Sequence, residues 1–197
     1  MNLKEMLIKE GIVKIKNKDE EPFTLKSGKK SRLFIDIKEA SLNPEILKRI
    51  TQDAIRIITE DIPNLSLTNA NFPDSHIFLF DKIASVAVGG VPIATALSLE
   101  TNESQIIVRS EKHDRGTQSQ VIGNCKGQRV LLIEDVATSG GSIVSAVRVI
   151  REFGGICNVC IVVVDREEGA KEWCVMNDIN LISLLKKSDF GINLSEE

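Results

Sequence analysis

From residue 83 onward, apolar runs of strand length alternate with glycine turns and helical segments, and this alternation restricts the fold most. Glycine pairs follow two of the runs and end one helix, at Gly89-Gly90, Gly140-Gly141 and Gly154-Gly155. Strands that alternate with helices predict an α/β fold with a mainly parallel central sheet flanked by helices, which binds ligands at the carboxyl ends of its strands. The runs, in chain order, are IASVAV, QIIVR, RVLLIED, CIVVVD and INLISLL.

The first part of the chain shows a more mixed pattern. Residues 2–10 predict an amphipathic helix, and the alternation over 23–38 predicts a hairpin around the sequence KSGKK. Asn43-Pro44 supplies a capping residue and a first-turn proline for a helix that runs to about Glu60. Residues 61–78 are rich in Pro, Asn, Ser and Asp, and we expect a long loop there, with room for a short strand at its end.

Length and charge exclude several classes of protein. A chain of 197 residues suits one domain, in which we expect an N-terminal element at 1–40 and a core at 41–190. The formal charge of -3 argues against binding nucleic acid through bulk positive charge. No segment reaches the roughly 18–20 apolar residues of a membrane span, and MNLKEMLIKEG lacks the apolar block of a signal peptide. We therefore expect a cytoplasmic protein with free thiols and no membrane partner.

The strongest chemical signal is the segment VLLIEDVATSGGS, residues 130–142. Glu134 and Asp135 lie where a buried strand emerges, so two carboxylates would be held at the edge of the sheet. Hydroxyl side chains and two glycines follow directly before a helix, whose first N–H groups favour an anion such as phosphate. No Lys follows the glycines, which excludes a Walker loop. The alternative is a strand-to-helix turn capped by Ser142, and we favour the phosphate site.

These residues resemble a known family. VLLIEDVATSGGS is similar to the phosphoribosyl pyrophosphate (PRPP) signature of type I phosphoribosyltransferases. FTLKSGKKSRLFID, VAVGGVPIATALSLE and DREEGA resemble the amino-terminal element, the pyrophosphate-side loop and the orotate-contacting segment of orotate phosphoribosyltransferases. The resemblance covers about residues 1–60 and 79–190. It implies a type I phosphoribosyltransferase fold with a small N-terminal hood, and transfer of ribose 5-phosphate from PRPP to orotate with Mg²⁺, which would be held mainly through PRPP.

The resemblance also implies roles for single residues. Glu134 and Asp135 would bind the ribose hydroxyls, Lys26 would reach the orotate or PRPP side of the pocket, and Phe34 would lie against the pyrimidine ring. Arg166 would pair with the orotate carboxylate, which a guanidinium fork fits well. The alternative for this arginine is an ion pair with Asp165, Glu167 or Glu168. The 5′-phosphate cradle would consist of Val136, Ala137, Thr138, Ser139, Gly140, Gly141 and Ser142.

The segment VRSEKHDRGT, residues 108–117, is similar to the family's mobile loop, which covers pyrophosphate and comes from the partner subunit. The resemblance thus implies a homodimer in which residues 109–117 are shared across the interface. Ser110 and His113 stand where the family usually has lysines, and Gly89 stands where some members carry a lysine that faces pyrophosphate. The alternative is a surface loop without a catalytic role. The expected catalytic residues are Arg109, Lys112 (in place of a displaced loop lysine), His113, Arg115 and Asp135.

Two further interpretations remain open beside the orotate enzyme. The first is a PRPP-dependent transferase that acts on another nucleobase, and the second is a regulator that binds PRPP without turnover. Cys157 and Cys160 form a lone CxxC within an apolar run, for which buried structural thiols are favoured over a metal or redox site.

Overall fold

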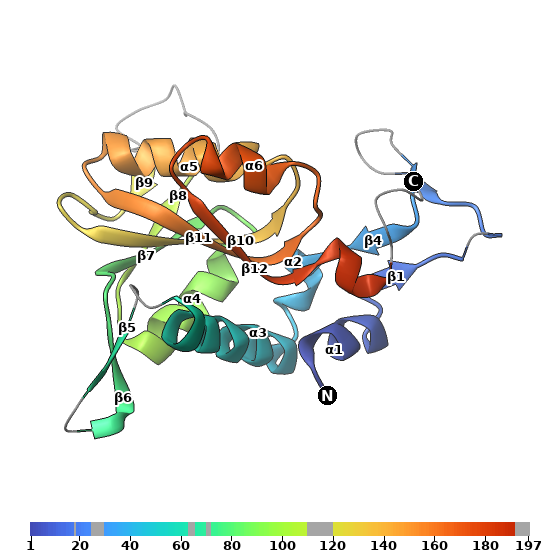
Figure 1. The fold of residues 1–197 in the computed structure, drawn as a ribbon, viewed down its shortest axis with the longest axis horizontal. Helices are drawn as coiled ribbons and strands as arrows, with labels where there is room; N and C mark the ends of the chain where they lie inside the picture. The colour runs from blue at the N-terminus through green and yellow to red at the C-terminus, as the bar shows by residue number, and fades with distance from the viewer. Residues whose placement is uncertain (18, 25–29, 63–65, 70–71, 110–119, 192–197) are drawn as a thin grey trace.

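The computed structural model describes residues 1–17, 19–24, 30–62, 66–69, 72–109 and 120–191, with a six-stranded sheet at its centre (Figure 1). The strand order is β12-β11-β10-β7-β8-β9, and every neighbouring pair is parallel except β8 with β9. The prediction of a mainly parallel α/β sheet is therefore confirmed. The strands are β7 (Lys82–Val86), β8 (Gln105–Val108), β9 (Val121–Ile122), β10 (Arg129–Ala137), β11 (Ile156–Asp165) and β12 (Asn180–Lys186).

Helices cover both faces of this sheet (Figure 1). One buried cluster joins the sheet to α1, α3 and α4 and includes Ile50, Leu97 and Ile133, while a second, on the α5 and α6 side, includes Leu132 and Val147. No helix within the described residues is long and apolar enough to cross a membrane. The helices are α1 (Leu3–Lys9), α2 (Ile37–Ala40), α3 (Pro44–Arg56), α4 (Val91–Thr101), α5 (Gly141–Glu152) and α6 (Ala170–Val175), with a π-helical turn η1 (Ile57–Asp61) and a 3-10 turn η2 (Lys187–Phe190).

Helix α3 begins where its capping sequence predicts. The Asn43 side chain accepts hydrogen bonds from the N–H groups of Glu45 and Ile46, at 3.0 and 3.3 Å, and Pro44 occupies the first turn. The helix ends at Arg56 and continues as η1 to Asp61, which agrees with the expected end near residue 60.

Two short antiparallel strand pairs form the N-terminal part, β1 (Val13–Ile15) with β4 (Leu33–Ile35) and β2 (Phe23–Thr24) with β3 (Lys30–Ser31). Figure 1 shows β1 and β4 beyond the carboxyl ends of the central strands. The expected hairpin is present as β2–β3, but β4 pairs with β1, and residues 37–40 form helix α2 instead of continuing as a strand. Helix α2 packs against β10, which brings the N-terminal part to the carboxyl edge of the sheet.

The segment 61–78 differs from the loop that its composition predicts. It contains β5 (Ser66–Asn69) and β6 (Phe72–Phe78), which pair in antiparallel register from Ser66 opposite Phe78. Backbone pairing is available to Asn, Ser and Asp as well as to apolar residues, so a polar composition was a poor guide here. In Figure 1 this strand pair extends from the end of the sheet opposite to β1 and β4.

Candidate active site

The acid pair lies on β10, a central strand that is bonded to β7 on one side and β11 on the other. Glu134 and Asp135 are only 5% and 7% exposed. The Glu134 carboxylate accepts a hydrogen bond from the Asp135 N–H, at 3.1 Å. Burial is the main cause that raises the pKa of Glu134 to about 9, and the adjacent Asp135 adds to the shift. Burial thus favours the protonated form of Glu134, and the Asp135 carboxyl group lies beside it on the same strand.

Asp135 has a cationic partner that the sequence analysis missed. The Nζ atom of Lys38, on α2, lies 3.2 Å from Oδ2 of Asp135, and the negative charge of Asp135 raises the pKa of Lys38. A basic residue three positions after the strand that carries Phe34 is the sequence signal that could have identified it. The contact itself depends on the packing of α2 against β10, which no local pattern reveals.

The glycine turn after β7 lies against the same acid. A Cβ atom on Gly89 would overlap the Asp135 carboxylate group, and one on Gly90 would lie 2.6 Å from the carbonyl oxygen of Ile133. Both positions therefore require a residue without a side chain so that the turn can approach β10. The turn and α2 together border the Asp135 carboxylate.

The turn between β10 and α5 has the form of an anion site. Gly140, at φ 81°, is the N-cap residue of α5, and no side chain caps this end of the helix. Ser142 is the second residue of the helix, so the alternative of a turn capped by Ser142 is not what forms. Thr138, Ser139, Gly141 and Ser142 are exposed, which leaves the first N–H groups of a 12-residue helix open to a ligand.

Arg166 follows β11 and is joined to this turn. Its N–H donates to the carbonyl oxygen of Ala137, at 2.9 Å, and its side chain is 12% exposed. Nε lies 2.9 Å from Oε1 of Glu168, so one of the alternative ion pairs is present. This ion pair does not have the angles of a hydrogen bond, however. Within the described structure, both Nε and Nη2 of Arg166 are buried without a hydrogen-bond partner. A buried guanidinium in this state is suited to a planar anionic ligand.

The other predicted residues lie in less defined surroundings. Phe34 is 36% exposed, and its ring lies 5.7 Å from that of Phe23 and 5.8 Å from Nζ of Lys14. Arg109, at the end of β8, lines a cavity of about 80 Å³ together with Ser142 of its own chain. The predicted residues Lys26, Lys112, His113 and Arg115 lie outside the described residues.

The cysteines agree with the expectation of structural thiols. All four are free and buried, and burial raises the pKa of Cys157 to about 12 and that of Cys174 to about 11. The described residues contain no group of three or more His, Cys, Asp or Glu side chains placed to hold a metal ion.

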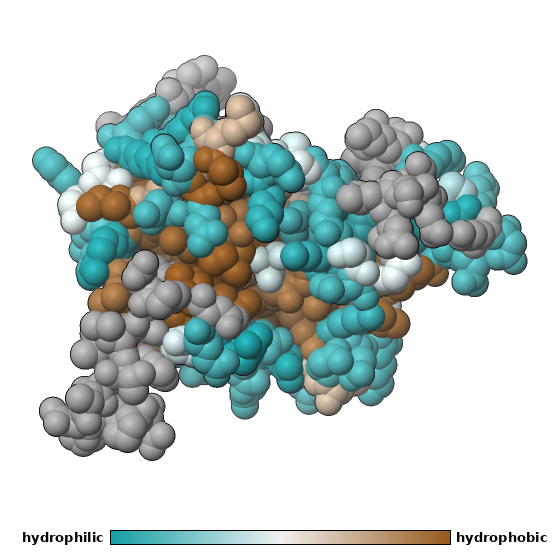
Figure 2. All heavy atoms as spheres, viewed as in Figure 1, coloured by the Kyte–Doolittle hydropathy of each residue, from teal (hydrophilic) through white to brown (hydrophobic). Residues whose placement is uncertain are grey.

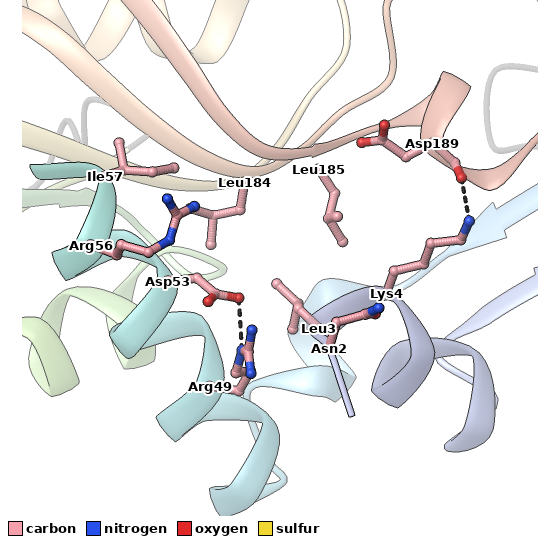
Figure 3. Close-up of a pocket in the computed structure, with 10 residues that line it drawn as sticks. All are labelled: Asn2, Leu3, Lys4, Arg49, Asp53, Arg56, Ile57, Leu184, Leu185 and Asp189. Atoms are coloured by element: carbon pink, nitrogen blue, oxygen red, sulfur yellow. Dashed lines mark hydrogen bonds and ion pairs between the residues drawn. The ribbon is translucent and has the colours of Figure 1, made fainter. Parts of the chain in front are cut away.

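A separate cavity of about 400 Å³ lies between α1, α3 and β12 (Figure 3). None of the predicted site residues lines it. Its basic groups already have partners: Arg49 pairs with Asp53 at 2.9 Å, Arg56 pairs with Glu60 at 3.5 Å, and Nζ of Lys4 donates to the backbone carbonyl oxygen of Asp189. The chemistry therefore centres on the carboxyl edge of the sheet.

Comparisons with known proteins agree with this site. Residues 49–190 match the family model of the phosphoribosyl transferase domain. The chain is 44% identical to the orotate phosphoribosyltransferase of Methanosarcina mazei over 85% of this chain and 81% of that protein. It is 38% identical to the enzyme of that name from Methanospirillum hungatei over 95% of each. The crystal structure of the Aeropyrum pernix orotate phosphoribosyltransferase superposes with a TM-score of 0.76 at 29% identity, over 95% of this chain and 94% of that one. With its acid pair, glycine turns and mainly parallel sheet, the chain has the type I phosphoribosyltransferase fold and belongs to the orotate phosphoribosyltransferase family.

Proposed function

We propose that the chain transfers the ribose 5-phosphate group of PRPP to orotate, which gives orotidine 5′-monophosphate and pyrophosphate in the biosynthesis of UMP. One observation carries the proposal: the hydrogen bond from the backbone N–H of Arg166 to Ala137, the last residue of β10, holds the candidate orotate-binding residue beside the start of the candidate phosphate turn. A site that couples the two groups has to hold a planar carboxylate and a phosphate at a fixed separation, as the product requires.

The residues have distinct tasks in this reaction. The bond between C1 of the ribose and pyrophosphate breaks, a bond forms from C1 to the pyrimidine nitrogen, and the proton of that nitrogen passes to the leaving pyrophosphate or to water. The Asp135 carboxylate receives the ribose hydroxyls next to C1, where positive charge develops, while the open start of α5 holds the 5′-phosphate. Arg166 orients orotate through its carboxylate, and Phe34 supplies an apolar surface for the ring. Catalysis therefore consists mainly of positioning and of compensating charge.

Enzymes of this family typically use PRPP with Mg²⁺, and the site suits this arrangement. Magnesium prefers oxygen ligands and often keeps few protein contacts when it binds phosphates. Asp135 offers a carboxylate, burial raises the pKa of Glu134, and the described residues hold no larger ligand cluster. Mg²⁺ would thus bind mainly to PRPP oxygens with Asp135 nearby, and it would neutralise the leaving pyrophosphate.

We further propose a homodimer in which residues 109–117 are shared across the interface, so that Lys112, His113 and Arg115 act on pyrophosphate. This proposal rests on the resemblance of the segment to the family's loop, and within its own chain Arg109 lines a cavity together with Ser142. Lys26 remains assigned to the substrate pocket. The single domain, with its division at residue 40, the cytoplasmic location and the lack of nucleic-acid or membrane partners remain predictions.

An absorbance assay tests the function. Purified protein, PRPP and Mg²⁺ should lower the absorbance of orotate, and should not consume uracil or adenine. Turnover of another base instead of orotate would favour the transferase of different specificity. Binding of PRPP without turnover of any base would favour the regulator.

A further inference from the structure

The ion pair between Lys38 and Asp135 joins a buried group to an exposed one. The Asp135 side chain is 10% exposed, whereas that of Lys38 is 65% exposed. The Lys38 side chain thus contacts Oδ2 of Asp135 while most of its surface stays exposed to solvent. Ion pairs with such an exposed member contribute little to stability, so the contact leaves the position of Lys38 easy to change.

Two elements from distant parts of the chain meet at this carboxylate. Helix α2 brings the Lys38 ammonium to Oδ2, and the turn after β7 brings Gly89 so close that a Cβ there would overlap the same group. The turn therefore offers no side chain at this place, whereas α2 brings a cation to it. The long, flexible stem of Lys38 can move this ammonium by several ångströms.

Substrate binding changes the charges around Asp135. In the proposed reaction the ribose hydroxyls bind Asp135, and pyrophosphate is attached to C1, the carbon next to the C2 hydroxyl. The ammonium of Lys38 then has a group of higher negative charge within reach of its side chain. We propose that Lys38 is a PRPP-binding residue, which balances the charge of Asp135 in the free enzyme and contacts the pyrophosphate group when PRPP is bound.

This inference rests on the proposed function for its ligand, but binding tests it without any turnover. Isothermal titration calorimetry in the presence of Mg²⁺ compares PRPP with ribose 5-phosphate, which lacks pyrophosphate. For Lys38→Met we expect PRPP to bind at least about tenfold more weakly, because the ammonium is lost, and ribose 5-phosphate to bind as to the wild type. Lys38→Arg, which keeps the charge, should recover most of the PRPP affinity.

The matched control is Arg129→Met. It removes the cation of the ion pair between Arg129 and Asp81, which has the same distance of 3.2 Å and lies at the opposite end of β10. It should leave the affinity for both ligands unchanged. Unchanged PRPP affinity in Lys38→Met overturns the proposal, as does an equal loss for both ligands, which would make Lys38 a positioning residue for Asp135. If the wild type binds PRPP but does not consume orotate, the proposed function fails while the test of Lys38 still holds.

Discussion

Strand β10 has an ion pair at each end, and the two pairs have similar geometry but different surroundings. At the carboxyl end Lys38 lies 3.2 Å from buried Asp135, and at the amino end Arg129 lies 3.2 Å from Asp81, whose side chain is 39% exposed. Arg129 also donates its backbone N–H to Asp81, at 2.7 Å. The amino-end pair is thus a surface contact in which Asp81 binds both the side chain and the backbone N–H of the first residue of β10.

The two ends of β10 differ in whether burial disfavours the charged form of a carboxyl group. Hydrogen bonds from Arg129 hold the pKa of Asp81 below its usual range, so this acid is ionised as it would be in water. At the carboxyl end, burial instead raises the pKa of Glu134. Carboxyl groups buried beside open glycine turns reduce stability, and we interpret their presence as a requirement of the ligand site.

The largest effect that would test this comparison is expected for Asp135→Asn. Removal of the carboxylate proposed to lie next to C1 should lower kcat/KM by about 100-fold or more, because charge compensation at the reacting centre is lost. The orotate absorbance assay measures the change, with circular dichroism as a check on folding. Activity within about twofold of the wild type would contradict the role of Asp135.

Arg166→Lys should have the next largest effect. A lysine keeps the charge but loses the planar fork, so KM for orotate should rise by about 10-fold to 100-fold while KM for PRPP changes little. Steady-state kinetics with each substrate varied in turn give both values. Arg129→Lys at the amino end serves as the control and should alter neither. An unchanged KM for orotate would remove Arg166 from the orotate site.

Sequence patterns predicted the parts of the site that are local in the chain. The start of α3 is as predicted, and the acid pair lies on the predicted strand, directly before the glycine turn and α5. The strand is longer than expected, however: β10 runs to Ala137, so Val136 and Ala137 belong to the strand and not to the turn. The contact of Lys38 with Asp135 was not predictable in this way, because it depends on the packing of α2 against β10. The raised pKa of Glu134 was missed for a related reason, since burial comes from the whole fold.

A smaller effect, on stability, is expected for Glu134→Gln. Between the unfolded pKa near 4.5 and the folded pKa of about 9, the folded chain binds a proton that the unfolded chain lacks. Wild-type stability should therefore fall as pH rises through this range, by up to about 1.4 kcal/mol per pH unit. Gln stays uncharged, so the variant should lose less stability toward alkaline pH, as measured by chemical denaturation. Parallel pH profiles of the two proteins would mean that Glu134 is ionised in the folded state.

The smallest effect is expected for Asp81→Asn, which breaks the ion pair at the amino end of β10. Because the pair is exposed, the Tm at neutral pH should fall by less than about 4 °C, and orotate turnover should stay at the wild-type rate. The folded pKa of Asp81 is lowered, so its contribution is present above the unfolded pKa and is lost as pH falls through the folded one. The difference in Tm between variant and wild type should therefore vanish in acid. A large loss of turnover would show that the amino end also serves the reaction, and the contrast between the two ends of β10 would then be wrong.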